Sequence, residues 1–302
     1  MNSRSGRGRS ALALIGALLV SACGERPPDT LTKTSAVVGG TPVLSSEQPA
    51  TGALVVVGEG GSPSSVCTGT VIAPRVVLTA AHCLVLNAGV LDFTFDASVA
   101  EAGSVIHGLA SHVDPDFAIG TSAGLENDLG ILELAEPVDV TPAVLLAPAD
   151  AAPYLVVGAS VDLVGYGATA TDGSGNGTRN AGRAAIASVD GQEFVVGGAD
   201  AGVVQSCTGD SGGPAYAPVD PPAAWLLGIA SRSAGTDSCA EGAVQIRVDA
   251  HRAWIDETVQ QIQAPPAGCA VAGTSPPPFP ALLVALALLG RRPRSRGGPA
   301  GA

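Results

Sequence analysis

The chain has 302 residues, of which 46% are apolar and 3% aromatic, and it contains 40 glycines and 23 prolines. This apolar content is enough to bury a sizeable core, so disorder of the whole chain is excluded, and the many turn-forming residues favour short strands over long helices. The formal net charge of −12 argues against nucleic-acid binding, because phosphate recognition needs clustered Lys and Arg.

The first element in chain order is a basic segment followed by a short apolar run. Three arginines among the first nine residues precede the run 11–20, which is too short to span a bilayer and is typical of a signal peptide. The run closes with the letters VSAC, which resemble the lipobox of bacterial lipoproteins, where cleavage leaves a lipidated N-terminal cysteine. We therefore expect a signal peptide over 1–22 and lipidation at Cys23. An ordinary signal peptide with a chance cysteine is the alternative.

Residues 37–262 have the pattern of two β-rich halves followed by a helix, after a polar propeptide or linker at 23–36. Strand-like runs occur in both halves, at about 37–137 and 150–247, and a Pro-rich stretch marks the crossover between them. From about 248 to 262 the apolar residues recur at helical spacing, which predicts one short helix. The expected strands are 52–58, 68–72, 76–80, 129–134, 154–158, 161–165 and one that resumes at 184.

The last segment, 263–302, combines a cysteine motif around Cys269, a Pro-rich spacer, the apolar run 281–290 and an Arg-rich end. This order resembles the MYXO-CTERM type of C-terminal sorting tag, which is processed in that family while the protein goes to the cell surface. About ten apolar residues are marginal for a permanent span, so a processed signal is favoured over a stable anchor. A disordered low-complexity tail is the alternative. We expect export to the cell surface, the outer membrane or the extracellular space.

Four of the six cysteines remain once Cys23 and Cys269 are assigned to the terminal signals. Four cysteines in an exported domain suggest two disulfides formed in an oxidising compartment. Their spacing contains no CxxC pair and no second close pair of ligands, so no zinc site is expected. No other metal and no cofactor is expected either. The four cysteines are Cys67, Cys83, Cys207 and Cys239.

The strongest local signal is the block GDSGGP, which contains Ser211. Such a glycine density around one serine suits a tight turn that exposes the hydroxyl and points backbone N–H groups at one spot. Because serine is a weak nucleophile, it needs a base to take its proton and a carboxylate to orient that base. His82 in the block TAAHC supplies the base, and Asp128, at the mouth of an apolar run, supplies the carboxylate.

Four blocks, VVGG from Val37, TAAHC, DLGIL and GDSGGP, occur in the order of the trypsin/chymotrypsin family, which the chain resembles over nearly all of 37–262. The order His82, Asp128, Ser211 also matches that fold and not the subtilisin or α/β-hydrolase orders. The resemblance implies an all-β fold of two six-stranded antiparallel β-barrels with a C-terminal α-helix and the active site between the barrels. It also implies a serine endopeptidase that works through an acyl-enzyme, with these three residues as its triad.

The resemblance assigns supporting roles to further residues. The backbone N–H groups of Gly209 and Ser211 would form the oxyanion hole, and Ser231 would donate a hydrogen bond to Asp128. The disulfides that it implies are Cys67–Cys83 and Cys207–Cys239, the second of which would brace the specificity pocket.

The match at the N-terminus of the domain implies a zymogen. Cleavage after Ala36 would free the amine of Val37 to pair with Asp210 beside the nucleophile. A buried ammonium–carboxylate pair is tolerable only with good geometry, so shortening the new terminus should collapse the oxyanion hole. Because Ala36 is neither Lys nor Arg, we expect an activating protease that prefers small residues.

Substrate specificity is where the chain departs from the trypsin-like pattern. Gln205 stands where trypsin-like members carry an Asp at the pocket floor, and a neutral floor cannot pair a substrate Arg or Lys. Ser233 and Ala243 replace the usual pocket-wall glycines and narrow the pocket, so we expect small or medium uncharged residues at P1, the position before the scissile bond. Arg232 stands where the family usually has an aromatic residue. The expected pocket residues are Gln205, Ser231, Ser233 and Ala243.

The expected partners are a protein or peptide substrate and an activating protease, and the enzyme is expected to be a monomer. Two alternatives differ in function. One is a catalytically inactive protease homologue that acts as a surface binding module, which the intact triad argues against. The other is a lipid-anchored scaffold whose enzyme domain is incidental, which an unchanged phenotype of Ser211→Ala would favour.

Overall fold

The computed structural model describes residues 37–264, apart from 45, 59–60, 62, 88, 121–123, 171, 199–203, 219–224 and 236–238. The predicted signal peptide, Cys23, the linker, Cys269 and the sorting tag lie outside the described residues. Within the described part, no helix has the length and apolar content needed to cross a membrane.

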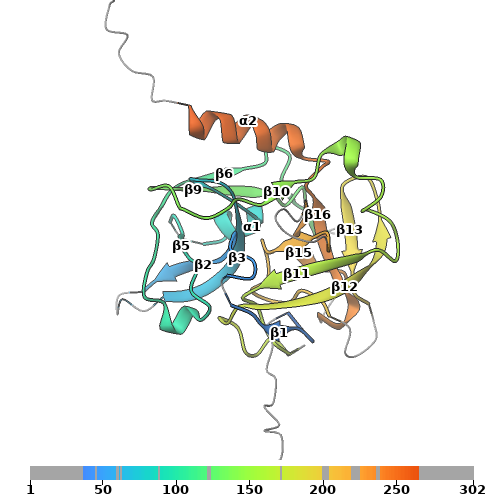
Figure 1. Cartoon of the computed structure of the whole chain (residues 1–302), viewed down its shortest axis with the longest axis horizontal. Helices are drawn as coiled ribbons and strands as arrows, with labels where there is room; N and C mark the ends of the chain where they lie inside the picture. Colours follow the sequence, from blue (N-terminus) through green and yellow to red (C-terminus); the bar gives the residue numbers. More distant parts are fainter. Residues whose placement is uncertain are drawn as a thin grey trace, which may run out of the picture. The chain divides into compact units, whose positions relative to one another are not determined.

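The first half of the domain forms a six-stranded antiparallel sheet (Figure 1). Reciprocal backbone hydrogen bonds join Phe93 to Ile106, so the two edges of the sheet come together. The interior is filled by apolar side chains that include Leu54, Val77 and Leu132. In sheet order the strands are β5 (Asp92–Thr94), β2 (Thr51–Val57), β3 (Pro63–Ala73), β4 (Val76–Thr79), β9 (Gly130–Leu134) and β6 (Gly108–Val113).

The second half forms an eight-stranded sheet, in which six antiparallel strands close a ring. The ring contains, in order, β11 (Ser160–Gly165), β14 (Pro214–Tyr216), β15 (Trp225–Ser233), β16 (Ala243–Arg247), β13 (Glu193–Val196) and β12 (Asn180–Val189). It closes because β12 pairs with both β11 and β13. Two further strands add to the ring: β1 (Thr41–Pro42) is antiparallel to β12, and β10 (Val144–Leu145) is parallel to β15.

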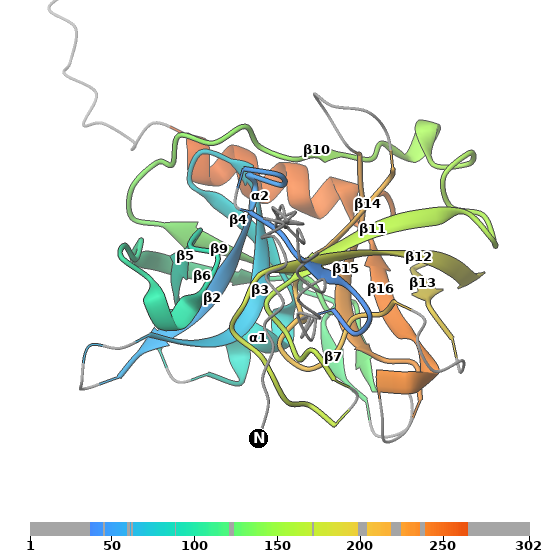
Figure 2. The ribbon, with the colours of Figure 1, turned by 60° about the horizontal axis from the view of Figure 1, so that its bottom comes forward.

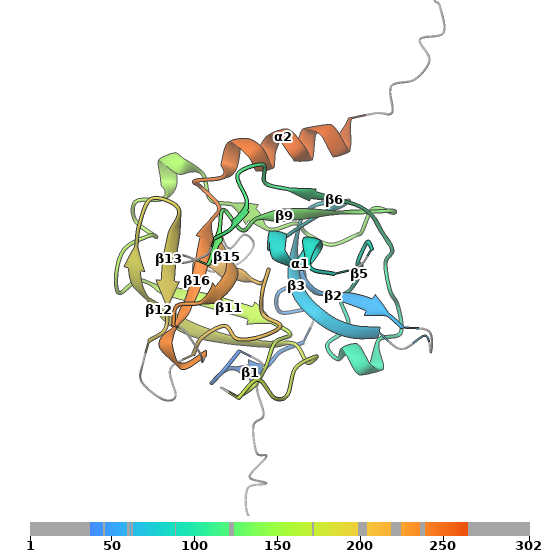
Figure 3. The same cartoon turned by 180° about the vertical axis from the view of Figure 1, so that it is seen from behind.

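The remaining elements are short except for the last helix. They are α1 (Ala81–Val85), η1 (Val99–Glu101), β7 (Ala118–Ile119), β8 (Leu125–Glu126), η2 (Pro148–Asp150), η3 (Cys239–Glu241) and α2 (Arg252–Gln263). Figures 1 and 3 show the two sheets next to each other, with α2 running along one side of both, and the same arrangement is visible from the direction of Figure 2.

One apolar core joins the two halves and fixes the relation between them. Leu78 of β4 and Ile131 of β9 belong to the same buried cluster as Ile229 of β15 and Ile246 of β16. Ile255 of α2 covers this cluster. Because β4 ends and β9 begins at the same edge, residues that follow β4 or precede β9 lie close to the junction of the two halves.

The predicted mostly β fold with a C-terminal helix is confirmed, while three local predictions differ from the structure. The strand expected to resume at 184 begins at Asn180. Residues 154–158 form turns and not a strand, because the amides of Tyr154 and Leu155 both donate to the carbonyl of Ala151. The helix begins at Arg252 and not at 248, because the amide of Val248 still donates to Leu227 on β15.

Candidate active site

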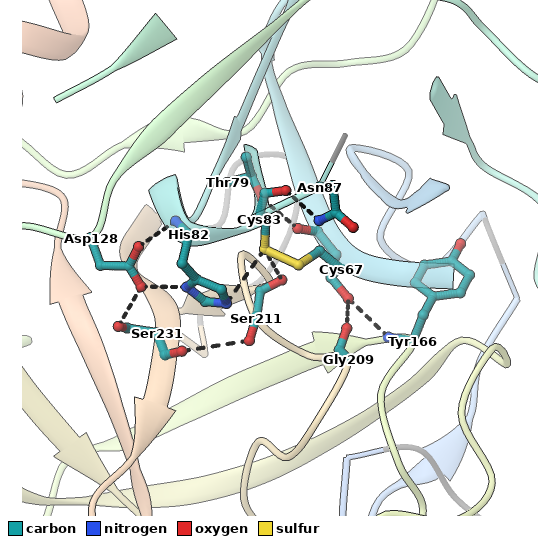
Figure 4. Close-up of a disulfide and its surroundings, with 11 residues drawn as sticks. Cys67, Thr79, His82, Cys83, Asn87, Asp128, Tyr166, Gly209, Ser211 and Ser231 are labelled. Atoms are coloured by element: carbon teal, nitrogen blue, oxygen red, sulfur yellow. Dashed lines mark hydrogen bonds and ion pairs between the residues drawn. A yellow bond between two sulfur atoms is a disulfide. The ribbon is translucent and has the colours of Figure 1, made fainter. Parts of the chain in front are cut away.

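Asp128 is fully buried and accepts three hydrogen bonds (Figure 4). Its Oδ1 accepts the backbone N–H of His82 at 2.8 Å, while its Oδ2 lies 2.7 Å from His82 Nδ1 and 2.6 Å from the hydroxyl oxygen of Ser231. A buried carboxylate is tolerated only when it is surrounded by such donors. Since the carboxylate can only accept, Nδ1 carries the hydrogen, and the other ring nitrogen, Nε2, is left able to take up a proton.

The chain positions His82 and Asp128 through two neighbouring strands. His82 lies in α1, directly after β4, and Asp128 lies two residues before β9, which pairs with β4. Asn127 adopts a φ of 47°, and its side chain donates to the carbonyl of Asp116 at 3.0 Å. Asn tolerates this left-handed conformation better than most residues, so it suits the sharp turn that directs Asp128 inward.

Ser211 lies in a turn whose conformation depends on glycine. Gly209 and Gly212 have φ values of 92° and 82°, which side chains other than glycine rarely adopt. A side chain on Gly212 would also collide with Thr68 and Thr79 of the first sheet. The amide of Thr68 donates to the carbonyl of Ser211 at 2.8 Å, so the turn of the second half is tied directly to the first half.

The hydroxyl of Ser211 and the ring of His82 face the same groove, which has a volume of about 510 Å³. Within the described residues no hydrogen bond joins them: the hydroxyl donates to the carbonyl of Ser231 at 3.5 Å, and His82 Nε2 lies 3.7 Å from the sulfur of Cys83. Hydrogen bonds of this kind are often absent before substrate binds.

Two backbone amides beside the hydroxyl are available to a ligand. The N–H groups of Gly209 and Ser211 have no hydrogen-bond partner in the part of the chain that the structure describes, whereas the amides of Asp210, Gly212 and Gly213 each donate to a backbone carbonyl. Two unpaired N–H groups next to a nucleophile are the arrangement that can stabilise a developing oxyanion.

Asp210 is buried behind the Ser211 turn and is held only by backbone amides among the described residues. The amide of Gly167 donates to it at 2.9 Å and that of Cys207 at 2.8 Å. Burial raises the pKa of Asp210 to about 7, because the cost of desolvation outweighs the hydrogen bonds from the amides of Cys207, Gly167 and Val37. Val37 itself is fully buried, and its backbone N–H is one of the donors to Asp210.

Both predicted disulfides are present, and the cysteines of both line the groove. Cys67–Cys83 ties the helix of His82 to β3, and Cys207–Cys239 ties the segment before Ser211 to the segment before β16. The sulfurs of Cys67 and Cys83 lie near His82, but they are bonded to each other and therefore offer no thiolate to a metal ion.

Three of the predicted pocket residues, Ser231, Ser233 and Ala243, line the groove, and Gln205 does not. Gln205 is 2% exposed, and its side-chain oxygen accepts the amide of Gly242 at 3.0 Å. None of the described residues that line the groove is acidic. Among these residues a substrate ammonium or guanidinium would therefore find no carboxylate partner.

A second cavity, of about 390 Å³, shares Arg232 with the groove. The guanidinium of Arg232 donates to both carboxylate oxygens of Glu193, at 2.8 and 2.7 Å. Sequence reasoning singled out Arg232 but missed Glu193, which comes from β13. No local motif marks Glu193, and only the pairing of β13, β16 and β15 brings it beside Arg232.

Known proteins resemble the chain in sequence and in fold. The family model described as Trypsin matches residues 37–255. Human serine protease 56 is 30% identical over 260 residues, which are 78% of this chain and 41% of that protein, so the chain spans less than half of this relative. The trypsin of Phaedon cochleariae is 29% identical over 64% of this chain and 79% of that protein.

The solved structure of neuropsin, a serine protease expressed in mouse brain, matches with a TM-score of 0.59 and 22% identity. The match covers 74% of this chain and the whole of the neuropsin chain. At this identity the match supports the fold alone.

Proposed function

Because the chain belongs to the trypsin family of serine proteases, we propose that it is an active serine endopeptidase with His82, Asp128 and Ser211 as its catalytic triad. The observation that carries the proposal is the set of three hydrogen bonds on Asp128, because these bonds hold the imidazole with Nε2 free to act as a base. The groove shared by His82 and Ser211 gives a peptide access to both.

In the proposed reaction, the oxygen of Ser211 attacks the carbonyl carbon of the scissile peptide bond while His82 Nε2 takes the hydroxyl proton. The carbonyl oxygen becomes an oxyanion held by the amides of Gly209 and Ser211, and in a comparable enzyme one such donor is worth about 2.7–4 kcal/mol. His82 then gives its proton to the leaving amine, which departs and leaves an acyl-enzyme. Water hydrolyses the ester by the same proton transfers in reverse order, while Asp128 stabilises the imidazolium.

We propose that the enzyme is made as a zymogen and activated by cleavage after Ala36. The support is the position of Val37, whose backbone nitrogen hydrogen-bonds to Asp210. Cleavage would turn this neutral amide into an ammonium, and an adjacent positive charge lowers the pKa of a buried carboxyl. The resulting ion pair would stabilise the turn that carries the amides of Gly209 and Ser211. Since Ala36 is small and uncharged, the activating protease would prefer small residues.

An uncharged P1 residue is the proposed specificity. It is supported by the absence of acidic side chains among the described residues that line the groove, and by the neutral Gln205 behind it. A buried substrate cation without a carboxylate partner would be strongly disfavoured.

We propose that the protein is exported from the cytoplasm. The two disulfides and the trypsin-like relatives favour a secreted or extracellular location. The terminal signals, with lipidation at Cys23 and a sorting tag at Cys269, would decide whether the enzyme stays attached to the cell surface.

Labelling with a fluorophosphonate tests the catalytic proposal on the matured protein. We expect the probe to modify wild-type protein whose N-terminus is Val37, and to leave Ser211→Ala unmodified. N-terminal sequencing and the intact disulfides show that the preparation is mature. Failure of such a preparation to react would instead favour the inactive homologue that binds partners at the surface.

A further inference from the structure

Gln245 of β16 is the feature of the domain that the proposed mechanism leaves unused. Its side chain is fully buried, and neither its oxygen nor its nitrogen has a hydrogen-bond partner within the described residues. A buried amide without partners loses its hydration and gains nothing in return, so a purely structural position would favour an apolar residue. The unpaired amide therefore points to a partner that the described residues do not supply.

The strand register places Gln245 next to residues that line the groove, although Gln245 itself is not among the lining residues. Ala243 lies two residues earlier on β16 and lines the groove, and residues two apart on a strand share a face. Gln245 also pairs with Ala230 of β15, a second groove-lining residue. Cross-strand partners project to the same face. Gln245 therefore lies on the same face as two residues that line the groove.

The neighbouring positions restrict where the amide can find a partner. Ile246 faces the opposite side, where it packs in the core beneath α2. On the groove side, a side chain built on Gly228 would touch both the ring of Phe194 and the Cβ of Gln245, so Phe194 fills the space on that flank. On the other flank lie Ala230 and Ala243, both of which line the groove, so this is the flank nearest to a bound substrate.

The other buried glutamine nearby serves as a comparison. The oxygen of Gln205 accepts the amide of Gly242, so that amide already has a partner within the chain. Gln245 has no such partner among the described residues, so both of its polar atoms are left to bind a ligand.

We infer that Gln245 forms the deep end of the substrate pocket and that its amide binds the side chain of a glutamine or asparagine at P1. A carboxamide has a carbonyl acceptor and two N–H donors, so two facing carboxamides exchange two hydrogen bonds. Methionine, which is close to glutamine in length, would leave both polar groups of Gln245 unpaired. This inference rests on the proposed endopeptidase activity and names its substrate class.

The test compares peptides that differ only at P1, with Gln, Asn, Met and Arg, on the matured enzyme. Active sites are counted by fluorophosphonate titration, so that kcat/KM refers to competent enzyme. We expect the Gln peptide to exceed the Met peptide by about tenfold or more, because a site built for a hydrogen bond rejects an analogue that lacks it. Gln245→Met should bring the ratio close to one while titration by the probe is retained.

Gln260→Met is the matched control, since it makes the same exchange at an exposed position on α2, and it should leave the ratio unchanged. Equal cleavage of the Gln and Met peptides by wild-type enzyme would overturn the inference, as would an unchanged ratio in Gln245→Met. If Gln245→Met does not fold, the ratio of kcat/KM for the Gln and Met peptides on wild-type enzyme still tests the inference. Normal probe labelling without a preference for Gln or Asn at P1 would contradict this inference alone. The absence of both labelling and cleavage would also contradict the proposed function.

Discussion

Two buried carboxylates lie on either side of Ser211, and they differ in what surrounds them. Asp128 accepts hydrogen bonds from a ring nitrogen, a hydroxyl and an amide that all belong to the folded domain. Asp210 is held by backbone amides alone among the described residues, and burial raises its pKa to about 7. The difference indicates that the set of donors to Asp128 is complete after folding, whereas in the proposed zymogen Asp210 still needs a positively charged partner.

The largest expected effect comes from removing the negative charge of Asp128. Asp128→Asn would present an amide N–H to the histidine ring, which favours the tautomer that cannot accept the serine proton. We expect kcat to fall by about 10⁴, as the same exchange does in a triad of this type. Steady-state kinetics on the matured enzyme measures the effect.

Asp114→Asn is the matched control for this prediction. Asp114 is also a buried carboxylate, and its oxygen lies 2.9 Å from the ring nitrogen of His251, outside the groove. Asp114→Asn should lower the stability of the fold and leave kcat within a few-fold of the wild-type value. A loss of kcat as large as that of Asp128→Asn would contradict the special role given to Asp128.

An effect of intermediate size is expected when pH changes the protonation of Asp210 in the uncleaved chain. Because its folded pKa of about 7 lies above the ordinary value of 3.8, the folded chain keeps a proton that the unfolded chain has lost. The associated stability is present below pH 3.8, is lost as pH rises toward 7, and falls by about 1.4 kcal/mol for each pH unit in that window. Thermal unfolding of uncleaved Ser211→Ala at several pH values measures the slope.

The matured form of the same variant provides the comparison. Its free Val37 ammonium should lower the pKa of Asp210 and remove most of the slope between pH 4 and 7. Asp210→Asn in the uncleaved chain should also flatten the curve, since it removes the titrating group. Identical slopes before and after cleavage would argue that the new terminus does not pair with Asp210.

The residues found from the sequence and those missed differ in how their roles are encoded. His82, Asp128 and Ser211 each stand in a short block whose neighbours are needed for the local turn, so the blocks themselves predict the residues. Gln245 and Glu193 stand in ordinary strand sequence. Their roles depend on which strands pair and in what register, and these pairings join residues far apart in the chain.

The same distinction holds for the fold. Apolar runs predicted β2, β3, β4, β9, β11 and part of β12, while the other strands were not predicted. The run 154–158 forms turns whose apolar side chains are only partly covered: Leu155 is buried while Val157 is 68% exposed. The parallel pairing of β10 with β15 was also not predictable, because two residues of strand have no periodicity to detect.

The smallest expected effect comes from removing one hydrogen bond to Asp128 while its negative charge is kept. Ser231→Ala deletes the hydroxyl that donates to Asp128 at 2.6 Å, but it keeps the backbone carbonyl that accepts the hydroxyl of Ser211. Since a hydrogen bond to a charged group is worth about 1.5–3 kcal/mol and two other donors remain, we expect kcat to fall by about tenfold. Ser231→Thr keeps the hydroxyl and should recover most of this loss, with kcat measured for both variants on one peptide. An unchanged kcat in Ser231→Ala would mean that the two bonds from His82 alone hold Asp128, and that the contrast with Asp210 rests on the histidine ring and not on the number of donors.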